Sequence, residues 1–187
     1  MKHKGWWLGS VVLIPMLALA GKGDHVKDKY WTSKYDRTFK KYTKRYFGPG
    51  MDWHWFKAQG IAESGLKAKA KSKAGAVGIM QIMPATFKEI KEKNPHFIDI
   101  TDPEWNIAAA IYYDRKLYKR WKKQLPNGEK LSFTFASYNA GHSKIRRAYK
   151  KAAEKAENVA EWEQVAPYSP SETRHYVRRI HGLMESK

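Results

Sequence analysis

Apolar residues recur every three or four positions along most of the chain, the spacing that places them on one face of an α-helix. The clearest case lies between residues 103 and 121, at Ile107, Ala110, Ile111, Leu117 and Trp121. The last segment, residues 170–184, repeats this pattern. The chain is therefore expected to be mainly α-helical.

Residues that favour helix ends bracket these segments. Asp102 precedes Pro103, and an Asp cap followed by a proline in the first turn is a common helix start. Pro84 is likewise expected to be the first residue of a helix, and Ser171 is expected to cap the last one. Residues 142–162, rich in lysine and alanine, predict one further helix with a solvated charged face.

One carboxyl group falls at the end of an apolar helix. A helix capped by Asp52 places Trp53, Phe56 and Glu63 near one face, and Gly65 ends it. Aromatic and aliphatic neighbours favour the neutral form of a carboxyl group, so the pKa of Glu63 should rise, as a general acid near neutral pH requires. Taken alone, a glutamate at this position is more often simply solvated.

The segment that follows this helix is rich in small residues. Gly75, Ala76 and Gly78 allow the backbone to pass close to a ligand. The amide of Gln81 can both donate to and accept from a sugar hydroxyl or an acetamide group. By itself, a loop of this composition is weak evidence for a binding site.

A second polar cluster closes the apolar run of residues 133–137. Tyr138 and Asn139 come just before Gly141, so a phenol and an amide are expected at a helix end, where they can reach a cleft. In isolation, this motif is more typical of an ordinary helix end with a buried tyrosine.

Three motifs together resemble the signature of soluble lytic transglycosylases, the bacterial lysozyme-like enzymes that cut the glycan strands of peptidoglycan. The first motif, within residues 63–84, is Glu-Ser, then Ser72, then Gly-Ala-x-Gly-x-Met-Gln-x-Met-Pro. The second is Tyr-Asn-Ala-Gly at residues 138–141, and the third is Glu-Thr-Arg-x-Tyr-Val at residues 172–177. The resemblance covers about residues 51–180. It departs from the family after the Glu-Ser pair, where many members carry an aromatic residue and then a proline, and residues 65–68 here are Gly-Leu-Lys-Ala. This departure bears on the shape of the sugar-binding subsites.

The resemblance implies a mainly α-helical, lysozyme-like domain of the goose-type lysozyme and transglycosylase kind, with Glu63 as the catalytic residue. In such enzymes one glutamate protonates the leaving oxygen of the β-1,4 bond between N-acetylmuramic acid and N-acetylglucosamine. It then takes the proton of the muramic C6 hydroxyl, so the product ends in a 1,6-anhydro ring and no water is consumed. The residues that the resemblance assigns to substrate binding are Ser72, Gln81, Met83, Tyr138, Asn139 and Glu172.

Several of these assignments carry a specific expected role. The resemblance implies that Tyr138 hydrogen-bonds near the reacting sugar and that Asn139 helps to hold its loop. It places Glu172 toward the glycan cleft, although an acidic residue in a first turn is also favoured by the helix dipole. Asp114, on the apolar stripe of its helix, is expected to be a boundary or paired group and not a second catalytic acid.

Two other functions fit parts of the same evidence. Goose-type lysozymes share the implied fold and a single prominent glutamate but hydrolyse the bond, leaving reducing ends. A non-catalytic basic module that binds cell wall or nucleic acid would fit the charge, yet none of the helix-turn-helix, zinc-ligand or ribonucleoprotein motifs occurs. The seven histidines show no metal-binding spacing, so neither a metal nor another cofactor is expected.

The N-terminal part of the chain predicts export. Lys2 and Lys4 precede an apolar run of about fifteen residues that ends Ala-Leu-Ala, typical of a cleaved secretory signal over residues 1–20. An uncleaved membrane anchor is the alternative. Residues 21–50 are a basic lead segment whose aromatic stripe predicts a helix docked on the domain, with nucleic-acid stacking as the alternative. Residues 51–187 then form the catalytic domain, and the expected location is the periplasm or the extracellular space.

The chain is strongly basic. Its 36 Lys and Arg residues face 18 Asp and Glu residues, a net charge of +18, and loss of residues 1–20 leaves +16. Such a field favours polyanionic partners. The expected partner is the carboxylate-bearing glycan of peptidoglycan, with nucleic acid disfavoured and a cell-envelope machine as a further candidate. Association with a membrane is expected only through the N-terminal segment or the charge.

Overall fold

The computed structural model describes residues 31–121, 125–126 and 128–187. Within these ranges every regular element is helical, as the apolar spacing predicts. In chain order the elements are α1 (Asp36–Phe47), α2 (His54–Ser64), α3 (Pro84–Lys93), α4 (Pro103–Arg120), α5 (Lys130–Ala140), α6 (His142–Ala153), α7 (Trp162–Val165), the 3₁₀ helix η2 (Ala166–Tyr168) and α8 (Ser171–Glu185). The predicted signal at residues 1–20 lies outside the described residues.

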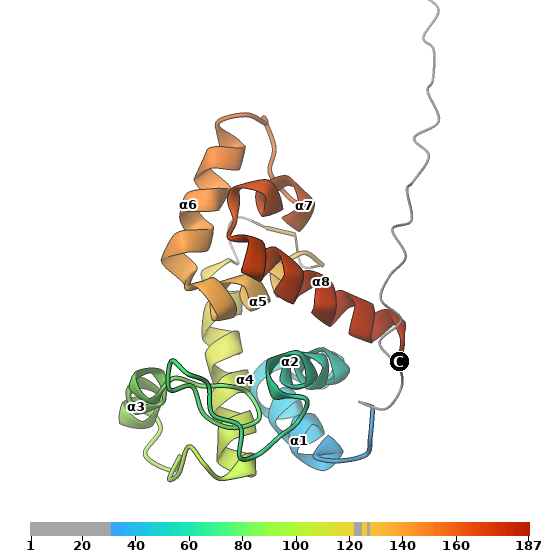
Figure 1. Cartoon of the computed structure of the whole chain (residues 1–187). Coiled ribbons are helices and arrows are strands. Elements are labelled where there is room, and N and C mark those ends of the chain that lie inside the picture. The colour runs from blue at the N-terminus through green and yellow to red at the C-terminus, as the bar shows by residue number, and fades with distance from the viewer. Residues whose placement is uncertain (1–30, 122–124, 127) are drawn as a thin grey trace, which may run out of the picture.

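Helix α4 joins the two halves of the molecule (Figure 1). Helix α1 packs along it, from Tyr42 beside Glu104 to Phe47 beside Tyr118. Helix α3 also contacts α4, and the last turns of α4 approach α5, which in turn packs against α6 and α8. Helix α8 crosses back to pack against α2. The last turn of α2 therefore lies beside helices that come from both ends of the chain.

The predicted helix starts are mostly confirmed. The Oδ1 atom of Asp102 accepts from the backbone of Glu104 at 2.8 Å and of Trp105 at 3.0 Å, and Pro103 is the first residue of α4. The prediction for Ser171 is wrong: it is the first helical residue, and Pro170 holds the cap position. Pro170 supplies the extended backbone that a cap position needs, with ψ of 142°, so the helix already includes Ser171.

The predicted helix over residues 142–162 is too long. Helix α6 ends at Ala153, and the chain turns before α7. The turn is held by Tyr149, whose hydroxyl donates to the carbonyl of Val159 at 3.1 Å, and Val159 itself is buried in the core. Burial of an apolar residue beyond the turn thus outweighs the helical propensity of the lysine- and alanine-rich sequence.

The aromatic stripe of the lead segment packs in the core, which confirms the docked-helix interpretation. Phe39 and Tyr42 of α1 are buried against the rest of the domain. The ammonium of Lys57 on α2 is also buried, and it donates both to the carboxylate of Asp36 and to the backbone carbonyl of Thr32. Residues 32–47 are thereby fixed to the helix that carries Glu63.

None of the helices in the described ranges has the length and apolar character needed to cross a membrane.

Candidate active site

Glu63 lies in the last turn of α2, one residue before the helix ends. As predicted, the helix ends at Gly65, which adopts a left-handed conformation with φ of 64° and donates from its amide to the carbonyl of Ile61 at 2.9 Å. The predicted cap is shifted by one residue: Trp53 and not Asp52 holds the cap position of α2, although the Oδ1 atom of Asp52 accepts from the backbone N–H of His54 at 3.0 Å.

The carboxyl group of Glu63 is held by α8. The hydroxyl of Tyr176 donates to Glu63 Oε1 at 2.5 Å. Burial raises the pKa of Glu63 to about 7 and outweighs the opposing effects of the Tyr176 hydrogen bond and the Arg179 charge, while the nearby charge of Glu172 adds to the increase. At neutral pH both forms of this carboxyl group are populated, so Glu63 can give up a proton and take one back.

Tyr138, at the end of α5, lies within electrostatic reach of Glu63. Burial raises its pKa well above the ordinary range, and the charges of Glu63 and Asp114 act in the same direction. Its hydroxyl donates to the carbonyl of Met80 at 2.9 Å, and its ring lies 5.7 Å from that of Tyr113. The phenol is therefore neutral and fixed, with its oxygen lone pairs as the remaining means of contact with a substrate.

Asp114 does not lie at the boundary of the apolar stripe, which was one of its two expected positions, because it is completely buried. Its Oδ1 atom accepts from the Nε2 atom of Gln59 at 3.3 Å, whereas Asp114 Oδ2 and Gln59 Oε1 have no partner. Burial raises the pKa of Asp114 well above its ordinary range, and the charge of Glu63 raises it further. The raised pKa favours the protonated acid, which adds a hydrogen-bond donor to the buried pair that Asp114 forms with Gln59.

The loop between α2 and α3 is anchored by a buried side chain of α4. Asn106 accepts from the backbone N–H of Met80 at 2.8 Å, and its Nδ2 atom donates to the carbonyls of Val77 at 3.0 Å and Ile100 at 2.9 Å. At the start of the loop, the hydroxyl of Ser64 donates to the carbonyl of Ile79 at 2.8 Å. The Met80 carbonyl that receives Tyr138 is thus fixed from several sides.

Gly78 is where this loop comes closest to Asn106. Its φ is 80°, and a Cβ atom at this position would lie 2.5 Å from Asn106 Nδ2. The small residue is therefore needed for packing of the loop against α4, whereas the sequence suggested close approach to a ligand.

Two other predicted site residues in this loop, Ser72 and Gln81, form hydrogen bonds within the protein. The hydroxyl of Ser72 accepts from the backbone of Ala76 at 2.9 Å, and the Nε2 atom of Gln81 donates to the carbonyl of Gly78 at 2.9 Å. Gln81 has a positive φ of 48°. Met83 is 42% exposed at the start of α3. Their contacts with substrate stay predictions.

Asn139 and Glu172 are placed differently from each other. The Oδ1 atom of Asn139 accepts from the hydroxyl of Thr173 at 2.8 Å, which ties α5 to α8. Glu172 is exposed in the first turn of α8, and its charge reaches Glu63. A direct role of either residue toward substrate stays a prediction.

Sequence reasoning missed three residues that act on Glu63 or its surroundings. Tyr176 was expected only as part of the buried side of the last helix, and the role of Arg179 was not foreseen. Gln59 is completely buried beneath the site. The Tyr within the Glu-Thr-Arg-x-Tyr-Val motif is the one signal that could have identified Tyr176.

In the described part of the chain, no group of three or more His, Asp or Glu side chains is arranged to hold a metal ion.

The chain is similar to known proteins in sequence and in fold. The family model of the transglycosylase SLT domain matches residues 38–160. The soluble lytic murein transglycosylase of Escherichia coli is 32% identical over 181 residues, which cover 94% of this chain and 25% of that protein. Membrane-bound lytic murein transglycosylase F of Shewanella pealeana is 28% identical over 151 residues, covering 80% of this chain and 29% of that protein. The chain thus spans about a quarter of the length of these relatives.

Solved structures give the same result for the fold. The 70 kDa soluble lytic transglycosylase of Escherichia coli superposes with a TM-score of 0.69 and 27% identity, over 83% of this chain and 24% of that one. A complex of the 70 kDa soluble lytic transglycosylase with bulgecin A gives a TM-score of 0.68, also at 27% identity. Because the family model matches well over half of the chain, this protein belongs to the transglycosylase SLT domain family.

Proposed function

We propose that this chain is a peptidoglycan lytic transglycosylase that cleaves the β-1,4 bond between N-acetylmuramic acid and N-acetylglucosamine. The observation that carries the proposal is the pKa of Glu63, raised to about 7 beside a donating tyrosine, in a domain of this family. The relatives named above are murein transglycosylases, which supports the same substrate.

Glu63 supplies both proton transfers in this proposal. As an acid it protonates the glycosidic oxygen, and the bond from that oxygen to C1 of the muramic residue breaks. The resulting carboxylate then takes the proton of the C6 hydroxyl, whose oxygen forms a bond to C1. The product ends in a 1,6-anhydro ring, Glu63 is again protonated, and no water is used.

The buried carboxyl group of Asp114 favours this mechanism over one in which Asp114 serves as a second catalytic acid. A glycosidase with two carboxyl groups needs one that is ionised and can reach the sugar or its attacking water. Asp114 does not meet this requirement because it is completely buried and its pKa is raised. Glu172 is exposed on α8 and is assigned a supporting role.

The test compares Glu63→Gln with the wild type on purified sacculi. The substitution is nearly isosteric but cannot transfer a proton, so the release of anhydro-muropeptides should fall by about a hundred- to ten-thousand-fold while the protein stays folded. Mass spectrometry separates anhydro ends from the reducing ends that a hydrolase would leave. Near-normal release by Glu63→Gln would refute the assignment of Glu63, and reducing ends from the wild type would refute the transglycosylase reaction.

We further propose that the protein is exported and acts on peptidoglycan in the periplasm or outside the cell. The apolar run before the Ala-Leu-Ala sequence of residues 18–20 supports this proposal. N-terminal sequencing of protein from the native host should find Gly21 first. Recovery of the intact apolar run in the membrane fraction would indicate an anchored enzyme instead.

A further inference from the structure

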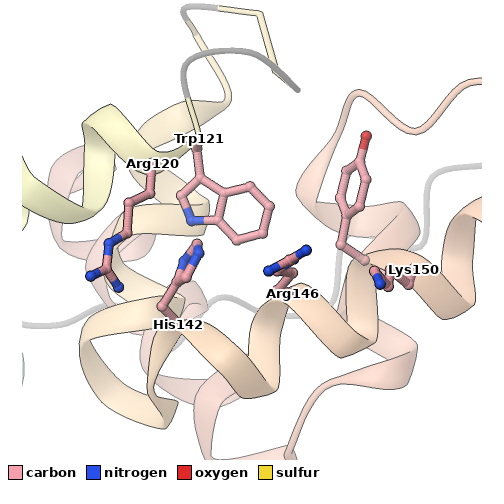
Figure 2. A pocket seen from close by; sticks show the side chains of 6 residues that line it. Arg120, Trp121, His142, Arg146 and Lys150 are labelled. Atoms are coloured by element: carbon pink, nitrogen blue, oxygen red, sulfur yellow. The ribbon is translucent and has the colours of Figure 1, made fainter.

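A pocket of about 580 Å³ lies between the end of α4 and one face of α6 (Figure 2). Three cations and several aromatic rings line this pocket, and Figure 2 shows Arg146 between Trp121 and Lys150. The lining residues are Arg120, Trp121, His142, Arg146, Tyr149 and Lys150.

The direction of the α6 side chains sorts its positive charges into two sets. His142, Arg146 and Lys150 are four residues apart and follow one face of the helix, toward the end of α4. Arg147 and Lys151, the next residues along the chain, line a different hollow beside η2. Arg147 also borders a shallow hollow with Arg146 and Lys150, whereas Lys144 and Lys151 line the hollow beside η2 and neither of the other two.

The cations of the pocket have no acidic partner in the described structure. Arg120, Arg146 and Lys150 are all exposed, and none of them forms an ion pair with a described carboxylate. A basic residue in the last turn of a helix is favoured by the helix dipole, which accounts for Arg120. That reason does not apply to Arg146 in the middle of α6. Like charges gathered around one hollow are best compensated by a bound anion.

The aromatic residues of the lining indicate what kind of anion fits. Trp121 is only 2% exposed, and its indole N–H donates to the hydroxyl of Ser137 at 3.0 Å. The Tyr149 hydroxyl is engaged with the carbonyl of Val159. Because Trp121 is buried, it offers no open ring face on which a nucleic-acid base could stack. The pocket is therefore suited to an oxyanion on a small apolar stem.

The pocket lies close to the proposed active site. Arg120 follows Tyr113 by seven residues on α4, two helical turns or roughly 10 Å. Burial raises the pKa of Tyr113 and lowers the pKa of His142, and the positive charge of Arg120 acts downward on both, which places Arg120 within electrostatic reach of each group. The ring of Tyr113 in turn lies 5.7 Å from that of Tyr138. Tyr113 therefore lies between the Arg120 end of the pocket and Tyr138.

We propose that this pocket binds a free carboxylate of the peptide carried by the glycan strand, and so selects strands whose peptides are not amidated near the bond to be cut. The proposal rests on the function proposed above. Guanidinium groups suit the carboxylate because their planar donors match its two oxygens. The carboxylate is a better candidate than phosphate because the peptide stems of the proposed substrate supply it next to the reacting sugar.

The matched test uses two double variants with the same change in net charge. Arg146→Gln/Lys150→Gln removes two cations from the pocket, and Lys144→Gln/Lys151→Gln removes two cations from the hollow beside η2. We expect the preference in kcat/KM for glycan with free carboxylates over amidated glycan to fall by roughly three- to tenfold in the first variant only. If the preference fell by the same factor in both variants, the proposal would be overturned, because a general electrostatic field would then explain the effect.

A binding experiment separates this proposal from the proposed reaction. Glu63→Gln protein is titrated with a muramyl peptide carrying free carboxylates, with the amidated peptide and with inorganic phosphate, while NMR follows the imidazole of His142. An anion between Arg120 and Arg146 should raise the pKa of His142, so the free peptide should raise it and the amidated peptide should not. An equal effect of phosphate at the same concentration, or no effect of the free peptide, would overturn the carboxylate assignment. Because this protein lacks the carboxyl group of Glu63, neither result depends on whether the reaction is correctly assigned.

Discussion

The hydroxyl of Tyr176 donates to Glu63 Oε1 at 2.5 Å and joins α8 to the last turn of α2. Burial and the Tyr176 hydrogen bond act on the pKa of Glu63 in opposite directions. Burial favours the neutral acid, whereas the Tyr176 hydrogen bond favours the carboxylate. The balance sets the pKa of Glu63 at about 7, close to the pH at which one group can serve as acid and then as base.

Tyr176→Phe should shift the pH profile of the enzyme. The substitution removes a donor to the carboxylate, so the pKa of Glu63 should rise above its wild-type value of about 7. The proton-donating step requires protonated Glu63, and the decline in kcat/KM at alkaline pH should therefore move to higher pH. Tyr168→Phe, at a tyrosine of η2 with no contact to Glu63 in the described structure, is the control. An unchanged alkaline limb in Tyr176→Phe would mean that Tyr176 does not tune this group.

Glu63→Gln should stabilise the protein at high pH. The folded pKa of Glu63, about 7, lies above the reference value of 4.5, so ionisation costs the wild type stability as pH rises from about 4.5 through 7. The glutamine of the variant cannot ionise and avoids this cost, which amounts to about 3 kcal/mol above pH 7. Thermal unfolding of both proteins between pH 4 and pH 9 measures the difference. A difference in Tm that does not grow with pH would contradict the raised pKa of Glu63.

Asp114→Asn should be tolerated much better than Asp114→Ala. If Asp114 is protonated, asparagine reproduces one acceptor and one donor toward Gln59, so the free energy of unfolding should change by less than about 1 kcal/mol. Alanine leaves the buried amide of Gln59 unpaired, at a cost of at least about 2 kcal/mol. Urea unfolding at pH 7 distinguishes the two cases. Equal losses would show that the buried group carries a charge that the amide cannot replace.

The sequence predicted the local features of the site because they depend on neighbours along the chain. The apolar spacing before Glu63 and the glycine at position 65 are enough to place a carboxyl group at the end of a buried helix. The raised pKa follows from the same argument. The cap at Asp102 was equally accessible, because an N-cap acts only on the next few residues.

Contacts between distant segments were not accessible in the same way. Tyr176 is 113 residues from Glu63, and its spacing on α8 shows only that it is buried. The engagement of Ser72 and Gln81 within their own loop was also hidden, since a polar side chain with binding potential has the same sequence signature whether it meets substrate or backbone. The pocket beside α6 depends on which face of α6 approaches α4, whereas the composition showed only a charged helix.

Gly78→Ala should disrupt the loop beside the site, whereas Gly75→Ala should be mild. Both glycines have positive φ, 80° and 90°, so alanine costs about 1–2 kcal/mol of backbone strain at either position. At Gly75 the new methyl group meets nothing within 4 Å, but at Gly78 it would lie 2.5 Å from Asn106 Nδ2. Asn106 must then move and weaken its bonds to Met80, Val77 and Ile100, for a further loss of about 2–4 kcal/mol. Unfolding in urea and the kcat of each variant check the pair, with the larger fall in both quantities expected for Gly78→Ala. Equal behaviour of the two variants would show that the close approach to Asn106 does not hold this loop.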